Sequence, residues 1–180
     1  MKLVKILSFS LLFGGLLTNV NAQGYGVKAG INIANATTGN LEETKNNTGF
    51  YVGVFKQMTL LPKVLYLQPE IQYSREGFKT NNREYNIDYI QVPVVAKLYF
   101  LKLFSIEAGP QIGFKIKDDA DNGAEVRDIN SFNTSLAIGA SLNLPLGFEL
   151  TARYISSFNE IADNTNAKGR TLQLGGSFSF

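Results

Sequence analysis

Hydrophobic and polar residues alternate along most of the chain from Gly24 onward. In the last segment, for example, Leu174 and Phe178 fall on one face of an extended chain. The intervening Gln173 and Ser177 fall on the other face. A period of two residues is typical of β-strands whose two faces meet different surroundings. The pattern predicts eight strands, at residues 24–36, 48–58, 64–78, 86–100, 103–116, 130–143, 148–158 and 170–180.

The lengths and connections of these strands favour a membrane protein. They run for roughly 10 to 15 residues, whereas soluble strands average about 5 to 6 and bilayer-crossing strands need about 9 to 11. Short connections alternate with longer polar ones, which puts all the long ones at one end. This arrangement is typical of outer-membrane barrels, with short periplasmic turns and longer extracellular loops. The expected extracellular loops are residues 37–47, 79–85, 117–129 and 159–169.

A soluble eight-stranded barrel of the lipocalin type would also show alternating strands. Such a barrel needs an apolar interior and a solvated exterior. Here one face carries aliphatic and aromatic residues, and the other carries Ser, Asn, Gln, Gly and a few charges. Because the interior of eight strands is narrow, the small polar face belongs inside and the bulky apolar face belongs in lipid. The predicted fold is therefore all-β, a closed eight-stranded antiparallel transmembrane β-barrel.

Aromatic residues gather near the predicted strand ends, as expected where rings settle at the headgroup level of each leaflet. The strand propensity of Tyr and Phe would give part of this distribution without a membrane. The expected periplasmic girdle comprises Tyr25, Phe100, Phe104, Phe148 and Phe180. The expected extracellular girdle comprises Tyr73, Phe78, Tyr89, Phe114, Phe132 and Tyr154.

Residues 1–22 have the pattern of a cleavable signal peptide. Lys2 and Lys5 precede an apolar run at residues 6–17, and small residues follow it. The run is too short to cross a bilayer as a helix, which takes about 20 residues. The alternative is a buried core helix. We expect an exported protein with a barrel domain at residues 23–180.

The amino-acid composition excludes many enzyme activities. The 180 residues include no Cys, no His and no Trp. The lack of Cys excludes disulfides and thiolate chemistry, and the lack of His excludes Ser-His-Asp catalysis and zinc-peptidase motifs within this chain. Loss of the signal segment removes two of the 17 basic residues and none of the 15 acidic ones, so 15 of each remain. This balance, with no basic cluster, argues against nucleic-acid binding.

The polar strand faces, turned inward, collect charged residues inside the barrel. Unpaired charge is costly in a medium of low dielectric, so these groups should pair or be hydrated. One interpretation is an ion-pair network that plugs the barrel, and the other is a narrow ion path whose selectivity the charges set. The narrow interior of eight strands favours the plug. The expected lumen charge network comprises Lys28, Glu70, Lys97, Glu107, Lys115, Glu149 and Arg153.

Other candidate chemistry is weaker. The carboxylates of Glu70, Glu107 and Glu149 could do acid–base work, but a hydrolase also needs a nucleophile or an activated water beside them. The acidic segment 117–128 misses the spacing of an EF-hand loop, which indicates a solvated loop. We expect no enzymatic activity, no cofactor and no metal site.

The last strand ends on an apolar face. Leu174, Phe178 and Phe180 lie on that face. They resemble the C-terminal signal by which outer-membrane barrels are recognised for insertion. A last strand that simply faces lipid would show the same residues, and both interpretations can hold together.

Five segments also carry the motifs of a known family. They are GYGVKAGINIAN at 24–35, TGFYVGVF at 48–55, LQPEIQY at 67–73, IQVPVVAKLYF at 90–100 and AGPQIGF at 108–114. In this order they resemble the small outer-membrane β-barrel family common in Bacteroidetes, often called porin-family or PorT-like. The resemblance covers essentially all of the expected mature chain and implies an eight-stranded outer-membrane barrel. It implies no shared catalytic residues, and no motif singles out the PorT branch that is linked to protein secretion.

These observations lead us to expect an integral protein of the cell outer membrane. We expect a structural or surface-interaction scaffold whose extracellular loops carry the function. The alternative is a narrow passive pore, or an accessory component of an outer-membrane transport or secretion assembly. The expected partners are outer-membrane lipid, the barrel-assembly machinery during insertion, and a surface or secretion partner at the loops.

Overall fold

The computed structural model describes residues 24–37, 45–80, 83–100, 103–120, 132–160 and 168–180. The predicted signal peptide and the central parts of the predicted extracellular loops lie outside these residues. None of the helical segments described is both long and apolar enough to cross a membrane.

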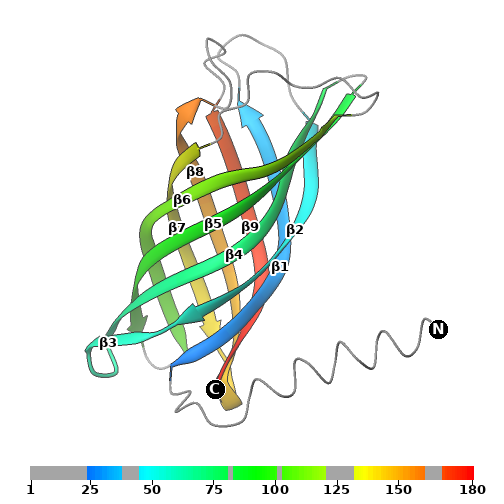
Figure 1. Cartoon of the computed structure of the whole chain (residues 1–180). Coiled ribbons are helices and arrows are strands. Elements are labelled where there is room, and N and C mark those ends of the chain that lie inside the picture. The colour runs from blue at the N-terminus through cyan, green and yellow to red at the C-terminus, as the bar shows by residue number, and fades with distance from the viewer. Residues whose placement is uncertain (1–23, 38–44, 81–82, 101–102, 121–131, 161–167) are drawn as a thin grey trace, which may run out of the picture.

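The described chain folds into strands that wrap around one axis (Figure 1). In chain order they are β1 (Tyr25–Thr37), β2 (Lys45–Lys56), β3 (Met58–Leu61), β4 (Leu65–Thr80), β5 (Arg83–Phe100), β6 (Phe104–Ala120), β7 (Phe132–Asn143), β8 (Phe148–Glu160) and β9 (Lys168–Ser179), with a short 3-10 turn η1 (Pro145–Gly147) before β8.

Every strand pair is antiparallel, and the sheet closes on itself. The first strand β1 pairs with the last strand β9, and β2 pairs with β4 as well as with β1. The short β3 follows β2 after Gln57 and pairs only with β4, so β2 and β3 together form one strand of the barrel. The predicted closed eight-stranded antiparallel barrel is confirmed. Closure satisfies the backbone groups of both edges, which is the condition for strands to cross lipid.

The two faces of the strands differ as the alternation predicted. On β6, Phe104, Ile106 and Phe114 point outward and are about half exposed. Their neighbours Ser105 and Glu107 point inward and are buried. This is the reverse of a soluble protein, because the exposed apolar belt has lipid as its solvent.

The strands extend further toward the long-loop end than the sequence pattern predicted. β4 and β5 remain paired as far as Thr80 and Arg83, so most of the predicted loop 79–85 is strand. β6 likewise runs to Ala120, into the predicted loop 117–129. The apolar alternation stops where the chain leaves lipid, whereas backbone pairing continues because ladder hydrogen bonds do not depend on apolar side chains.

Two details of the predicted faces differ in the structure. Tyr89 was expected in the outer aromatic girdle, but it is buried and shares the inward face of β5 with Gln91. The interior is also not uniformly polar. Val95, Ala137 and Ile155 form a small buried apolar cluster inside the barrel. These three residues lie on β5, β7 and β8. They therefore contribute no ionic group to the part of the lumen that they line.

Candidate functional site

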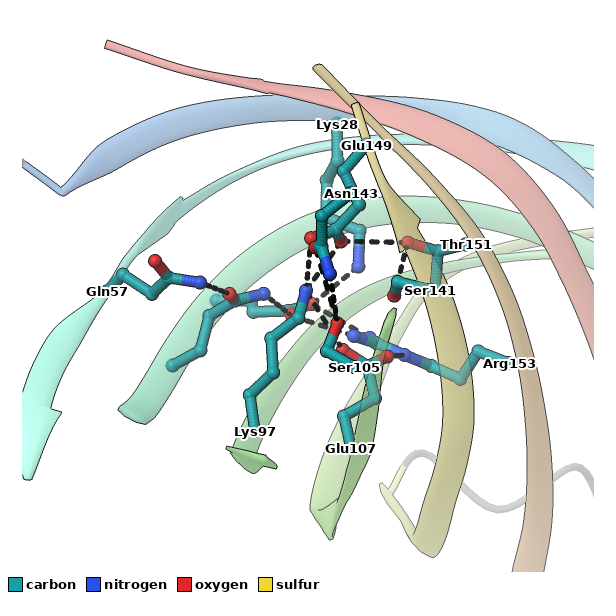
Figure 2. Close-up of polar contacts among 12 residues, drawn as sticks. Lys28, Gln57, Lys97, Ser105, Glu107, Ser141, Asn143, Glu149, Thr151 and Arg153 are labelled. Carbon is teal, nitrogen blue, oxygen red and sulfur yellow. Dashed lines mark hydrogen bonds and ion pairs between the residues drawn. The ribbon is translucent and has the colours of Figure 1, made fainter. Parts of the chain in front are cut away.

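The charged side chains of the lumen come from five strands. Six of the seven residues expected in the network form one connected cluster, because the period of two turns each of them inward (Figure 2). The cluster contains three cations and three carboxylates, so its formal charge is zero. Its members are Lys28 on β1, Glu70 on β4, Lys97 on β5, Glu107 on β6, and Glu149 and Arg153 on β8.

Arg153 lies at the centre of the cluster. Its Nη1 and Nη2 donate hydrogen bonds of 2.8 Å each to the two carboxylate oxygens of Glu70. Its Nε donates to Glu107 Oε1 at 2.6 Å. Lys28 Nζ donates a further 2.7 Å bond to Glu70 Oε2. A planar guanidinium suits this arrangement, since it offers several donors at fixed angles.

Lys97 extends the cluster toward β8. Its Nζ lies 2.5 Å from Glu149 Oε1 and 3.7 Å from Glu107 Oε2. Thr151 Oγ1 also donates to Glu149 Oε1, at 2.9 Å. The ion pairs therefore cross the lumen from β4 to β8 and from β5 to β8, as Figure 2 shows.

The cluster is almost completely removed from solvent. Arg153 and Lys97 are each 1% exposed and Glu70 is 2% exposed. Burying a charge without partners would cost several kcal/mol, roughly 3–5 for a pair that loses one member. The mutual pairing of all six groups offsets this cost, and it also ties together strands far apart in sequence.

Glycines make room for the largest inward side chains. A Cβ at Gly139 would meet Glu107 Oε1 at 2.9 Å. Tyr51 lies over the registered pair Gly30 and Gly175, where a Cβ on either glycine would collide with the tyrosine ring or hydroxyl. The close approach needed by the lumen side chains thus explains why glycine occupies these strand positions.

A layer of amides lies further toward the long-loop end of the lumen. Gln72 donates to Gln91 at 2.7 Å, and Gln91 donates to Glu76 at 2.7 Å. Asn32 donates to the Ser74 hydroxyl at 2.8 Å. Among the described residues, buried side-chain atoms that form no hydrogen bond are Asn32 Oδ1, Gln72 Oε1, Glu107 Oε2, Gln111 Oε1 and both polar atoms of Gln173.

Unpartnered buried polar atoms of this kind are commonly satisfied by internal water. The charge-based prediction did not include these amides. The same period of two that placed the charged residues inward also places Gln72, Gln111 and Gln173 inward.

The remaining predicted residues lie elsewhere. Lys115, expected in the network, lies further along β6 toward the loops and is only partly buried. Leu174, Phe178 and Phe180 face outward at the short-turn end, where the Phe178 ring lies 4.9 Å from that of Phe148 and 6.0 Å from that of Phe180.

The described part of the lumen pairs its hydroxyls and carboxylates with neighbouring side chains. Within the described ranges no group of three or more Asp and Glu side chains is arranged to hold a metal ion. The inward hydroxyls form hydrogen bonds to neighbouring side chains, Ser105 with Asn143 and Ser141 with Thr151. Of the described lumen carboxylates, Glu70, Glu107 and Glu149 are held by Lys or Arg. Glu76 instead accepts hydrogen bonds from Ser74, Gln91 and Thr171.

A closed antiparallel barrel with an apolar outer belt and a polar, charged lumen defines an integral outer-membrane β-barrel. Residues 19–163 match the family model for the outer membrane protein beta-barrel domain. The chain therefore belongs to that family, and its location is the outer membrane. No curated protein matches the chain.

Solved structures show the same fold at low sequence identity. Neisserial surface protein A aligns with a TM-score of 0.60 and 17% identity, over 89% of this chain and 100% of that one. The attachment invasion locus protein Ail of Yersinia pestis, in complex with the heparin analogue sucrose octasulfate, aligns with a TM-score of 0.54 and 18% identity over 88% of this chain and 99% of that one. At these identities the likeness establishes the fold alone.

Proposed function

We propose that the protein is a non-enzymatic outer-membrane scaffold whose extracellular loops bind a surface partner. The observation that carries this proposal is the ionic cluster around Arg153, which fills the lumen from β4 across to β8. A sealed barrel transports nothing, so its useful surface is the end that projects from the membrane.

The strand extensions beyond the apolar belt support the same proposal. β4 and β5 are paired as far as Thr80, the last residue of β4, and Arg83, the first residue of β5. Such extensions raise the loops above the headgroups on a rigid stalk. On the outer face of this stalk Arg75 binds Asp88 through two hydrogen bonds of 2.7 and 2.9 Å.

Single-channel recording tests the sealed lumen. The refolded chain is inserted into a planar bilayer, and its folding is verified beforehand by circular dichroism. We expect no discrete conductance steps at moderate voltage. Reproducible steps from folded protein would refute the sealed barrel and make a conduit the leading function.

A narrow passive pore is the second candidate, and the unpartnered amides favour it. Water beside Gln72, Gln111 and Gln173 would hydrate the lumen as far as the ionic cluster. The cluster would then act as the barrier. If an ion path exists, Glu70→Gln and Glu107→Gln should each change the conductance of the barrel or its ion selectivity. The reason is that each change leaves part of the ionic cluster unpaired. A closed barrel should stay silent with either change.

A secretion assembly is a further candidate for the partner. An accessory role in secretion is the role of the PorT branch of the family that the motifs resemble. We place it below the scaffold because no motif of this chain singles out that branch. We also propose that Leu174, Phe178 and Phe180 act during insertion by the barrel-assembly machinery. Their outward position on β9, beside Phe148 at the short-turn end of the barrel, supports this role.

A further inference from the structure

The outer wall of the barrel has a hollow at the short-turn end. It measures about 590 Å³ and lies over β1, β2, β8 and β9. β2, β1 and β9 lie side by side in Figure 1. The hollow is distinct from the lumen, because its apolar walls belong to the outward faces of these strands.

The strand register explains the hollow. One outward row runs Val54, Val27, Phe178, Phe148 across four neighbouring strands. The next outward row toward the loops runs Val52, Ala29, Gly176, Leu150. The two small residues Ala29 and Gly176 lie at the centre of the second row, between the larger Val52 and Leu150. The floor of the hollow is the strand backbone beneath Ala29 and Gly176.

The surroundings determine what chemistry can fill this space. The hollow lies on the lipid face of a membrane-spanning barrel, so its contents must be apolar. Its volume falls in the range of small-molecule sites, about 300–1,000 Å³. A second copy of the chain fits poorly, because a two-fold interface centred here would place hollow against hollow and double the void. A flexible acyl chain can follow the hollow instead.

A cation stands at the rim. Along β2 the outward positions are Val52, Val54 and then Lys56, so the ammonium-bearing residue begins about 7 Å beyond the apolar wall. Lys56 is exposed, and its Nζ lies 4.8 Å from the ring centroid of Tyr25, its register partner on β1. Tyr25 belongs to the aromatic girdle that marks the headgroup level.

We propose that this hollow binds one phospholipid of the inner leaflet, with its phosphate at Lys56 and an acyl chain over Ala29 and Gly176. Apolar depth and a cation at headgroup height together match the two parts of such a molecule. The site is independent of the loops and of the lumen, so it holds whether or not the barrel conducts.

Native mass spectrometry tests the proposal. The chain refolded in a non-ionic detergent is titrated with phosphatidylglycerol or with diacylglycerol, which lacks the phosphate. Gly176→Leu fills the hollow; a Cβ there meets Glu149 O at 3.4 Å and Leu150 Cδ2 at 3.8 Å, so the backbone need not move. Ala29→Leu fills the hollow from the neighbouring strand. Ala140→Leu on the outer face of β7 and Lys63→Gln in the β3–β4 turn are the matched controls.

The proposal requires one tightly retained phosphatidylglycerol per chain. Lys56→Gln should lower the affinity for phosphatidylglycerol about fivefold, the effect of one Lys at an anionic lipid surface, and leave diacylglycerol binding unchanged. Gly176→Leu and Ala29→Leu should lower both affinities, and the controls should alter neither. Equal lipid retention by wild type and folded hollow-filling variants would overturn the proposal. A dimer mass that Gly176→Leu abolishes would also overturn it, in favour of a second copy.

Discussion

Arg153 decides the electrostatics of the lumen at the scale of single residues. It holds Glu70 and Glu107, two carboxylates that would otherwise repel each other in a buried space. The pair of Arg75 with Asp88 lies on the outer face, where the arginine side chain is 38% exposed and the aspartate 8%, so water screens the pair on the arginine side. The same chemical pairing therefore has different consequences inside and outside the barrel.

Replacing Arg153 by Met should reduce the free energy of unfolding by about 3–5 kcal/mol, because two buried carboxylates lose their shared cation. The measurement is urea unfolding in lipid vesicles followed by circular dichroism, since the chain has no Trp to report by fluorescence. Arg75→Met is the control and should cost less than Arg153→Met, because water reaches the Arg75 side of its pair with Asp88. Adding Glu107→Gln to Arg153→Met restores a formal charge of zero, with Lys28 still paired to Glu70 and Lys97 to Glu149, and should recover much of the loss. Failure to recover it would show that packing, not charge, dominates.

Two adjacent glycines test the lumen packing at the same scale. A Cβ at Gly175 points inward and collides with the Tyr51 hydroxyl and a backbone carbonyl of β1. A Cβ at Gly176 points outward and meets only ordinary contacts. Gly175→Ala should lower the free energy of unfolding by about 1–3 kcal/mol, whereas Gly176→Ala should be nearly neutral. Equal effects of the two changes would contradict the assigned faces.

At the scale of elements, β9 closes the barrel and ends the described chain. It pairs with β1 and β8 along most of its length, so closure waits for its insertion. Its outward residues Phe178 and Phe180 join Phe148 in an aromatic group at the short-turn end.

Phe180→Asp should lower the amount of folded protein in outer membranes severalfold. A charge on the lipid face costs most at the midplane and less near the interface, so the expected defect is in insertion more than in the stability of the folded barrel. The check is the heat-modifiable gel band of the expressed protein, compared with Phe180→Tyr, which keeps the ring. Normal folded yield of Phe180→Asp would remove the assembly-signal hypothesis.

At the scale of the whole molecule, the barrel and the loops should be separable. The described strands form their own ring of hydrogen bonds, and none of these bonds needs the connecting segments. Replacing residues 121–131 with a Gly-Ser linker of the same length should therefore leave the unfolding transition within about 1 kcal/mol of wild type, because loop-closure entropy depends weakly on composition and length. If loop 121–131 binds the surface partner, adhesion of cells expressing the variant should fall.

The architecture follows from the local pattern of the chain. Because a strand's side chains alternate with a period of two, the pattern assigned a face to each residue from Phe104 to Lys115 without any tertiary information. Strand length and the alternation of short and long connections then distinguished a membrane barrel from a soluble one. The same alternation predicted that Lys28, Glu70 and Arg153 share the interior.

Which of these residues come into contact depends on the folded barrel. Residues 70 and 153 are neighbours because ring closure and strand tilt bring β4 opposite β8, and neither property is local in sequence. Closure of β9 on β1 also set Ala29 beside Gly176. The pairing of β4 with β5 past the apolar pattern is likewise a property of the paired strands. Side-chain alternation is a property of one strand, whereas contacts across a barrel depend on register, and register is fixed only when all strands pair.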